Sequence, residues 1–253
     1  MEDPMSELLI ERGEGTLRIT INVPERLNSI TTDMVNQISD ELDNADGVRV
    51  AVITGVGRAF CSGAVMAPGA ANAEILQAAD RLIHTMTQAP FPIVAAVNGL
   101  AAGIGSSIAL ACDVQVTKDS DYFLQAFINV GLMPDGAANE LLAASIGRTR
   151  ALKLLLLGEK LPNIEGERLG LITYAVPEEE WQPLVDKTVE TFATGPTRAY
   201  AATKQAVNSA SLSQLSETLK RETIGQTELG TSADFEEGVA AFVGKRKANF
   251  TGK

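Results

Sequence analysis

The residues most suited to chemistry are those that would expose backbone amides at one point. The stretch from Asn98 to Asp113 follows an apolar run, 91–97, that we expect to form a buried strand. It then passes through a turn containing Gly103 and Gly105 into an uncharged, alanine-rich helix. A strand that ends in glycines and opens a helix presents unpaired N–H groups at one place. Such a place can bind a phosphate, a carboxylate or the oxyanion of a reacting carbonyl.

A second segment, 54–64, has the same character. It is rich in turns and small residues, which allow a ligand to approach the backbone closely. The two segments give two candidate donor sites, near Ala64 and near Ile104, each directly after a glycine. If the two sites lie together in the fold, they form a two-donor oxyanion hole.

Other uses of these residues fit less well. The run around Gly103 and Gly105 is not a dinucleotide fingerprint, because Ile108 stands where the third glycine belongs, and no P-loop Lys-Ser/Thr pair follows. Ser106 and Ser107 are not in a nucleophile elbow and have no placed base, which argues against a serine hydrolase.

Metal and histidine chemistry are also disfavoured. Cys61 and Cys112 lack metal-ligand spacing, so we expect no metal site. The one histidine, His84, lies in a helical pattern, and we expect it to be structural or exposed.

Composition narrows the class further. The chain has 253 residues, 45% of them hydrophobic, as expected for one large globular domain or one with a small appendage. Its 32 acids outnumber its 21 bases, giving a net charge of −11, so we expect no nucleic-acid partner. Residues 91–112 carry no charge but are interrupted by Pro92 and several glycines, so we expect no membrane span. Two cysteines and no leader pattern indicate a cytoplasmic protein.

The secondary structure expected around these segments indicates the α/β fold class. Strands alternate with helices up to about residue 177 and helices alone follow, whereas 122–131 gives no clear pattern. The expected strands cover 8–12, 16–23, 48–53, 91–97 and 113–117. The expected helices include one carrying Met34, Ile38, Leu42 and Ala45, then 73–88, 148–157, 165–169, 179–193, 197–208, 213–228 and one ending near 243.

Three helix caps are expected. Thr31 or Thr32 caps the first helix, and Asp234 with Glu237 forms a capping box for the last. Asp135, in a Met-Pro-Asp-Gly turn, is a candidate cap for the helix that begins near Ala137.

Several motifs together resemble one family. The segments 24–29, 57–64, 97–103 and 131–136, with the ending 235–250, occur in the order and spacing of the enoyl-CoA hydratase/isomerase (crotonase) family. The resemblance implies a crotonase-like spiral of ββα units over 1–195 and a helical C-terminal trimerisation region over 196–253. It further implies an acyl-CoA thioester as substrate, no metal or redox cofactor, and a homo-trimer or dimer of trimers.

The same resemblance implies site residues. The amides of Ala64 and Ile104 would stabilise the enolate formed from the thioester. Asp135 matches the position of the catalytic aspartate in members that isomerise or otherwise process acyl-CoAs. The implied substrate-binding residues are Arg26, Leu27, Ser62, Ala64, Val65, Met66, Leu100, Gly103, Ile104, Phe127, Val130 and Lys245.

The departures from the family pattern bear on the reaction. Hydratases of the family use two glutamates, whose positions are Ser107 and Phe127 here, and Val65 replaces a common aspartate. Asp135 is the remaining acid, and a carboxyl beside an acyl chain should have a raised pKa that suits proton shuttling. We therefore expect double-bond isomerisation with Asp135 as acid/base. The alternatives are hydration or thioester hydrolysis using Asp135 alone, a non-catalytic acyl-CoA-binding subunit, and a helix cap as the whole role of Asp135.

Overall fold

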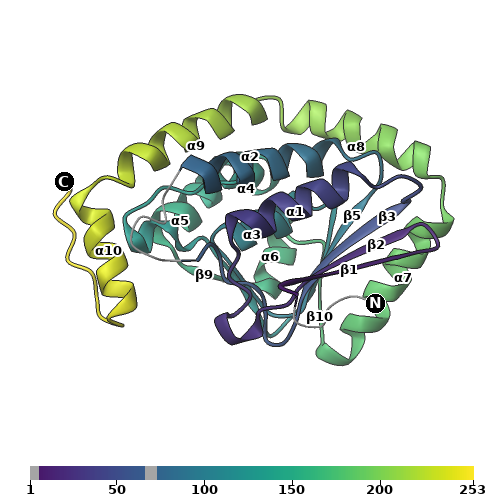
Figure 1. Cartoon of the computed structure of the whole chain (residues 1–253), viewed down its shortest axis with the longest axis horizontal. Helices are drawn as coiled ribbons and strands as arrows, with labels where there is room; N and C mark the ends of the chain where they lie inside the picture. Colours follow the sequence, from purple (N-terminus) through teal and green to yellow (C-terminus); the bar gives the residue numbers. More distant parts are fainter. Residues whose placement is uncertain (1–5, 66–72) are drawn as a thin grey trace.

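The computed structural model describes residues 6–65 and 73–253, and within them the chain forms two sheets with helices packed around them (Figure 1). The larger sheet has the order β1-β2-β3-β5-β7-β10. Strands β1 and β2 are antiparallel and the others run parallel. Its strands are β1 (Leu8–Gly13), β2 (Thr16–Ile21), β3 (Val50–Gly55), β5 (Ile93–Val97), β7 (Val114–Lys118) and β10 (Tyr174–Val176). The expected α/β class is confirmed, and the two expected N-terminal strands, 8–12 and 16–23, pair as an antiparallel hairpin.

The second sheet consists of short strands that sequence patterning does not reveal. Its order is β4-β6-β8-β9, with β4, β6 and β8 parallel and β9 antiparallel to β8. The strands are β4 (Ala59–Cys61), β6 (Leu100–Ala102), β8 (Tyr122–Leu124) and β9 (Lys160–Pro162). Three residues are too few to show an alternating pattern, which is why 54–64 reads as turns and 122–131 has no clear pattern.

Helices cover both faces of the larger sheet. One face packs into the main hydrophobic core with three helices, α1 (Thr32–Asp43), α2 (Ala73–Gln88) and α3 (Ile104–Ala111). On the opposite face α7 (Glu178–Thr194) packs on the β3, β5 and β7 side chains through Val185 and Trp181. Strands buried on both faces explain the uninterrupted apolar runs of β3 and β5.

The described residues contain six further helices. They are α4 (Ala138–Ile146), α5 (Arg148–Leu157), α6 (Asn163–Leu169), α8 (Thr197–Ser211), α9 (Leu215–Leu229) and α10 (Ala233–Val243), with 3-10 turns at Pro24–Arg26 and Ala126–Val130. Figure 1 shows α8 and α9 as an arch along α2 that ends in α10. Among the described residues, no helix combines the length and apolar character that crossing a bilayer requires.

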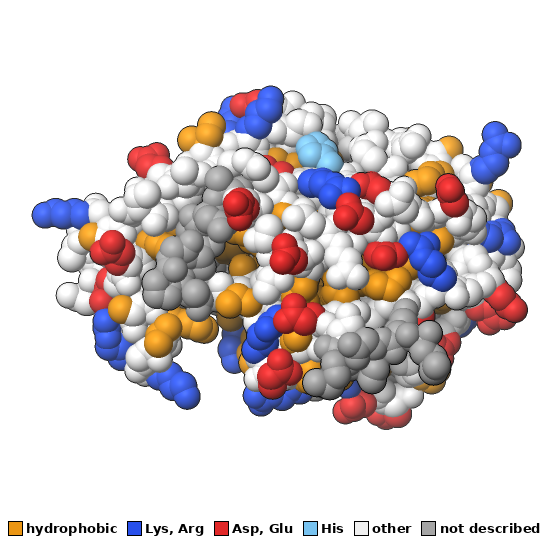
Figure 2. All heavy atoms as spheres, viewed as in Figure 1, with side chains coloured by type: hydrophobic (Ala, Val, Ile, Leu, Met, Phe, Trp, Pro, Cys, Tyr) orange, Lys and Arg blue, Asp and Glu red, His pale blue; other side chains and the backbone are white. Residues whose placement is uncertain are grey.

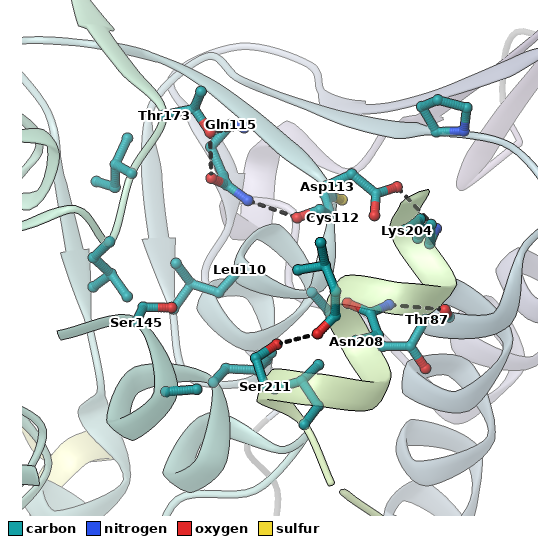
Figure 3. A pocket seen from close by; sticks show the side chains of 18 of the residues that line it. Thr87, Leu110, Cys112, Asp113, Gln115, Ser145, Thr173, Lys204, Asn208 and Ser211 are labelled. Carbon is teal, nitrogen blue, oxygen red and sulfur yellow. Dashed lines mark hydrogen bonds and ion pairs between the residues drawn. The ribbon is translucent and has the colours of Figure 1, made fainter. Parts of the chain in front are cut away.

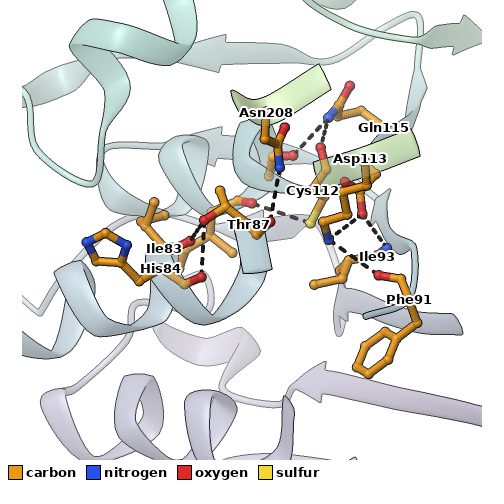
Figure 4. Close-up of polar contacts among 12 residues, drawn as sticks. Ile83, His84, Thr87, Phe91, Ile93, Cys112, Asp113, Gln115 and Asn208 are labelled. Atoms are coloured by element: carbon orange, nitrogen blue, oxygen red, sulfur yellow. Dashed lines mark hydrogen bonds and ion pairs between the residues drawn. The ribbon is translucent and has the colours of Figure 1, made fainter. Parts of the chain in front are cut away.

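A partly buried ion pair, in which Lys204 is buried and Asp113 reaches solvent, fixes the start of this arch. Lys204 of α8 donates to Oδ2 of Asp113 at 2.8 Å and to the carbonyl of Phe91 at 3.3 Å. The same Oδ2 accepts from the amide of Ile93 at 2.7 Å, so one carboxylate joins α8 to β5 and to the end of α3 (Figure 4). Burial raises the pKa of Asp113, and the Lys204 ammonium opposes that rise.

Two of the expected helix caps are wrong, and one is confirmed. Thr31 caps α1 by accepting from the amide of Met34. The last helix is capped by Ser232, whereas Asp234 accepts from the amides of Thr251 and Gly252 at the C-terminus. Because the Asp234 carboxylate binds these C-terminal amides, the hydroxyl of Ser232 caps the helix instead.

Asp135 is not the cap of α4 either. The N-cap position of α4 is Ala137, in the left-handed conformation, and its own side chain makes no capping bond. Glu222 of α9 supplies the acceptor, at 2.8 Å from the amide of Ala137 and 3.3 Å from that of Asn139. The Asp135 carboxyl is therefore available for another role.

Candidate active site

Two segments that end in glycine converge beside α3. Strands β4 and β6 run parallel, with Ala59 opposite Leu100 and Cys61 opposite Ala101, so Gly63 and Gly103 follow at the same end. A Cβ added to Gly103 would lie 3.6 Å from the Cα of Gly63, which shows direct backbone contact. Both glycines have positive φ, 107° and 53°, which other residues rarely adopt.

The amides that follow these glycines lie beside one cavity. Ile104 is the first residue of α3, so its amide has no partner within the helix. Ala64 forms an isolated bridge with Ile30, in which the bonding amides are those of Ile30 and Val65. Within the described residues, neither Ala64 nor Ile104 donates a backbone hydrogen bond, and both line the cavity.

The cavity has a volume of about 380 Å³ and mostly apolar walls. Its walls come from the ends of β4 and β6, from α2, from the 3-10 turn 126–130, and from α9 and α10. Figure 2 shows hydrophobic side chains beside a hollow between the C-terminal segment and the body. The lining residues that the sequence predicted are Ser62, Ala64, Gly103, Ile104, Phe127, Val130 and Asp135.

Asp135 is the one acid among the described residues that line this cavity. Its Oδ2 accepts from Nε2 of Gln226 at 3.1 Å, whereas Oδ1 is buried and has no partner within the described chain. Burial raises the pKa of Asp135 well above its usual value, and the carboxylates of Glu222 and Asp80 raise it further. This direction is the one that the sequence leads us to expect for a carboxyl beside an acyl chain.

Ser107 supports the turn that holds Asp135. Its hydroxyl donates to the carbonyl of Asp135 at 2.9 Å, and its side chain is completely buried. A Cβ added to Gly136 would lie 2.9 Å from the Cβ of Ser107, so the turn passes directly over α3. The side chain at this position therefore anchors the backbone of the aspartate.

The other predicted substrate-binding residues lie around the cavity or away from it. Ser62 connects the Pro24–Arg26 turn to the site, since its amide donates to Leu27 and its hydroxyl to the carbonyl of Arg26. Among the described residues, Arg26, Leu27, Val65, Leu100 and Lys245 do not line the cavity, and Met66 lies outside the described residues. Their roles stay predictions.

Sequence reasoning missed the contributions from distant helices. Gln226 of α9 reaches Asp135 from 91 positions along the chain. Phe235 and Phe242 of α10 and Arg246 also line the cavity, and Arg246 is held by a two-bond contact with Glu237. No local pattern marks these residues, because their neighbours are set by tertiary packing alone.

A larger cavity, of about 470 Å³, lies between α3, α4 and α8 (Figure 3). It contains none of the predicted site residues, and its ionic groups, Asp113 and Lys204, already pair with each other. His84, on α2 (Figure 4), is not among the described residues that line either cavity. The smaller cavity is lined by Ala64 and Ile104, whose amides donate no backbone hydrogen bond within the described residues, and by Asp135, one of whose carboxyl oxygens has no partner there. It is the candidate active site.

The family model described as enoyl-CoA hydratase/isomerase matches residues 11–253. The chain belongs to this family. It is therefore an enzyme of the enoyl-CoA hydratase/isomerase type, and an acyl-CoA is its class of substrate.

Individual relatives agree with this assignment. A probable enoyl-CoA hydratase of Rhodobacter capsulatus is 40% identical, over 96% of this chain and 97% of its own. The 1,2-epoxyphenylacetyl-CoA isomerase of Escherichia coli is 35% identical, over 98% and 100%. The crystal structure of an enoyl-CoA hydratase from Mycobacterium avium subsp. paratuberculosis superposes with a TM-score of 0.93, at 41% identity, over 97% of this chain and 99% of that one. The crotonase fold expected from the resemblance is confirmed.

Proposed function

We propose that this member of the family is an acyl-CoA isomerase that moves a double bond along the acyl chain, with Asp135 as the proton carrier. The observation that carries the proposal is the single acid at the cavity: among the described lining residues, only Asp135 has a carboxyl group. Two-acid activation of a water is not supported, because Ser107 is an anchored hydroxyl and Phe127 is apolar.

The proposed step conserves all atoms of the substrate. The thioester oxygen accepts hydrogen bonds from the amides of Ala64 and Ile104, which stabilise the negative charge as a proton leaves C2. Asp135 takes this proton, the double bond moves from C3–C4 to C2–C3, and the proton returns at C4. The apolar cavity supports this use of a carboxyl, because burial keeps its pKa high enough to release and recover a proton. We propose that no metal or redox cofactor takes part.

The names of two relatives point to two different reactions. The Escherichia coli relative is named an isomerase, and the Rhodobacter capsulatus relative a probable hydratase. Hydration by Asp135 alone is therefore the second candidate, and thioester hydrolysis by the same carboxyl is tested beside it. A homo-trimer or a dimer of trimers stays a prediction, to be measured by light scattering.

The test is incubation with 2-enoyl-, 3-enoyl- and arylacetyl-derived CoA thioesters, followed by liquid chromatography and mass spectrometry. Isomerisation gives unchanged mass with altered retention, hydration adds the mass of one water, and hydrolysis releases free CoA. No change with any thioester, together with tight binding, would favour a non-catalytic subunit. Asp135→Asn should retain the fold and CoA binding and lose turnover, and full turnover by this variant would refute the role of Asp135.

A further inference from the structure

We propose that Gln226 is a positioning residue that holds the carboxyl group of Asp135 in one orientation for proton transfer. This inference rests on the proposed function and extends it to a residue of a different helix. It assigns to Gln226 a role in the reaction without contact with the reacting carbons.

Helix α9 directs two polar side chains inward, one turn apart. Glu222 and Gln226 are only 1% and 2% exposed. Burial of such groups costs free energy unless their hydrogen bonds are made, so both need partners inside the protein. Both find them in the segment from Met133 to Asn139, which contains Asp135.

The amide group of Gln226 joins the side chain of Asp135 to its own turn. Nε2 donates to the carbonyl of Met133 at 2.6 Å and to Oδ2 of Asp135 at 3.1 Å. A primary amide has two N–H donors, so these two contacts use both. The carboxyl is thereby held relative to the backbone two residues before it.

The backbone of the turn is held by other residues. Ser107 donates to the carbonyl of Asp135, and Glu222 accepts from the amides of Ala137 and Asn139. These contacts remain if Gln226 is replaced. Gln226 therefore restrains the rotation of the Asp135 carboxyl group. This restraint can be removed without removing the contacts that hold the turn.

The contact also distinguishes the two oxygens. Because Oδ2 accepts the N–H of Gln226, a proton on the carboxyl is placed on Oδ1, which has no partner within the described residues. The carboxyl held in this way would take the proton from C2 and return it to C4, with no co-reactant. A carboxyl free to rotate would exchange its two oxygens between these events and lose alignment with one of the carbons.

The test uses 3-hexenoyl-CoA as substrate, hexanoyl-CoA as a non-reacting ligand, and the full chain. Gln226→Met keeps the length of the side chain and removes the donor. We expect kcat to fall by about 10²-fold, the loss typical of a misplaced catalytic group, with KM and the Kd of hexanoyl-CoA unchanged. In D₂O, the fraction of product with deuterium at C4 should rise. Gln214→Met, at the exposed start of the same helix, should behave as the wild type.

A second variant covers the case in which Gln226→Met fails to fold. In Gln226→Glu, the introduced carboxyl can donate to Oδ2 only while protonated, so kcat should fall as pH rises. The titratable groups around this position are Asp135 itself, Glu222 on α9, and Asp80 and His84 on α2. They are common to both proteins, so the additional pH dependence relative to the wild type reports the introduced group.

The outcomes separate the two proposals. Loss of kcat in Gln226→Met, with binding retained and more deuterium at C4, supports the positioning role. If Asp135→Asn is inactive while Gln226→Met matches the wild type in kcat and deuterium content, the inference about Gln226 is wrong and the proposed function stands. If Asp135→Asn retains wild-type turnover, the role of Asp135 is wrong, and that of Gln226 with it.

Discussion

Replacing Glu222 with glutamine should change how the stability of the protein depends on pH. Burial raises the pKa of Glu222 from 4.5 to about 7, and the N–H groups of Ala137 and Asn139 oppose that rise only in part. The folded state therefore holds this proton more tightly than the unfolded state does. By linkage, the contribution is fully present below pH 4.5 and is lost as pH rises through the folded value.

The magnitude follows from the difference between the two pKa values. A rise from 4.5 to about 7 corresponds to about 3 kcal/mol, since each pKa unit is worth about 1.4 kcal/mol. At pH 5.5 one of the roughly 2.5 units between the unfolded and folded pKa values already lies below the pH. About 2 kcal/mol of the contribution is therefore lost between pH 5.5 and 8. Over this range the free energy of unfolding of Glu222→Gln, measured relative to the wild type, should therefore increase by about 2 kcal/mol.

The assay is urea denaturation at several pH values, followed by the fluorescence of Trp181 and by circular dichroism. Trp181 suits this purpose because it is the single tryptophan and is anchored to β7 by a 2.9 Å bond to the carbonyl of Val116. Glu217→Gln, on the exposed face of the same helix, is the control and should follow the wild type. A constant difference between Glu222→Gln and the wild type across this range would refute the reasoning.

Three further predictions concern packing and buried charge. Lys204→Met should lower the free energy of unfolding by about 1–3 kcal/mol, because it leaves the partly buried Asp113 carboxylate without its cation; Lys153→Met, in an exposed pair, should cost about 1 kcal/mol or less. Gly105→Ala should cost about 1–3 kcal/mol in the same measurement and lower kcat, since the added Cβ would lie 2.5 Å from the carbonyl oxygen of Cys61. Neither Cys61, whose pKa burial raises to about 12, nor the fully buried Cys112 should react with iodoacetamide until urea unfolds the chain, as mass spectrometry would show.

The elements that the sequence predicted are those with a local signal. The alternation of Leu17, Ile19 and Ile21 marked β2, and the cap at Thr31 marked the start of α1. Short strands such as β8 and β9 carry too few residues for a period, and they form because neighbouring strands pair with them. Local sequence is sufficient for long amphipathic elements and insufficient for three-residue strands.

For the candidate site, too, the residues with a local signal could be predicted. Ala64, Ile104 and Asp135 could be proposed from glycines, a turn and a family pattern, and the structure places them at one cavity. The cap role considered for Asp135 was wrong, because Glu222, 85 positions after Ala137, accepts the hydrogen bond at the start of α4. Gln226 is equally remote from its partner. Such contacts depend on how α9 lies across the molecule, which no short stretch of sequence specifies.

The convergence of Gly63 and Gly103 affects how the site would respond to mutational scanning. The proposed oxyanion donors are main-chain N–H groups, and one of them belongs to a residue that is already alanine. An alanine scan would therefore leave both donors in place and would assign the reaction to side chains alone. Over generations of sequence change the same property separates two traits. In the proposed reaction, thioester activation would depend on the path of the backbone and the fate of the enolate on a few replaceable side chains, so one could diverge while the other is inherited intact.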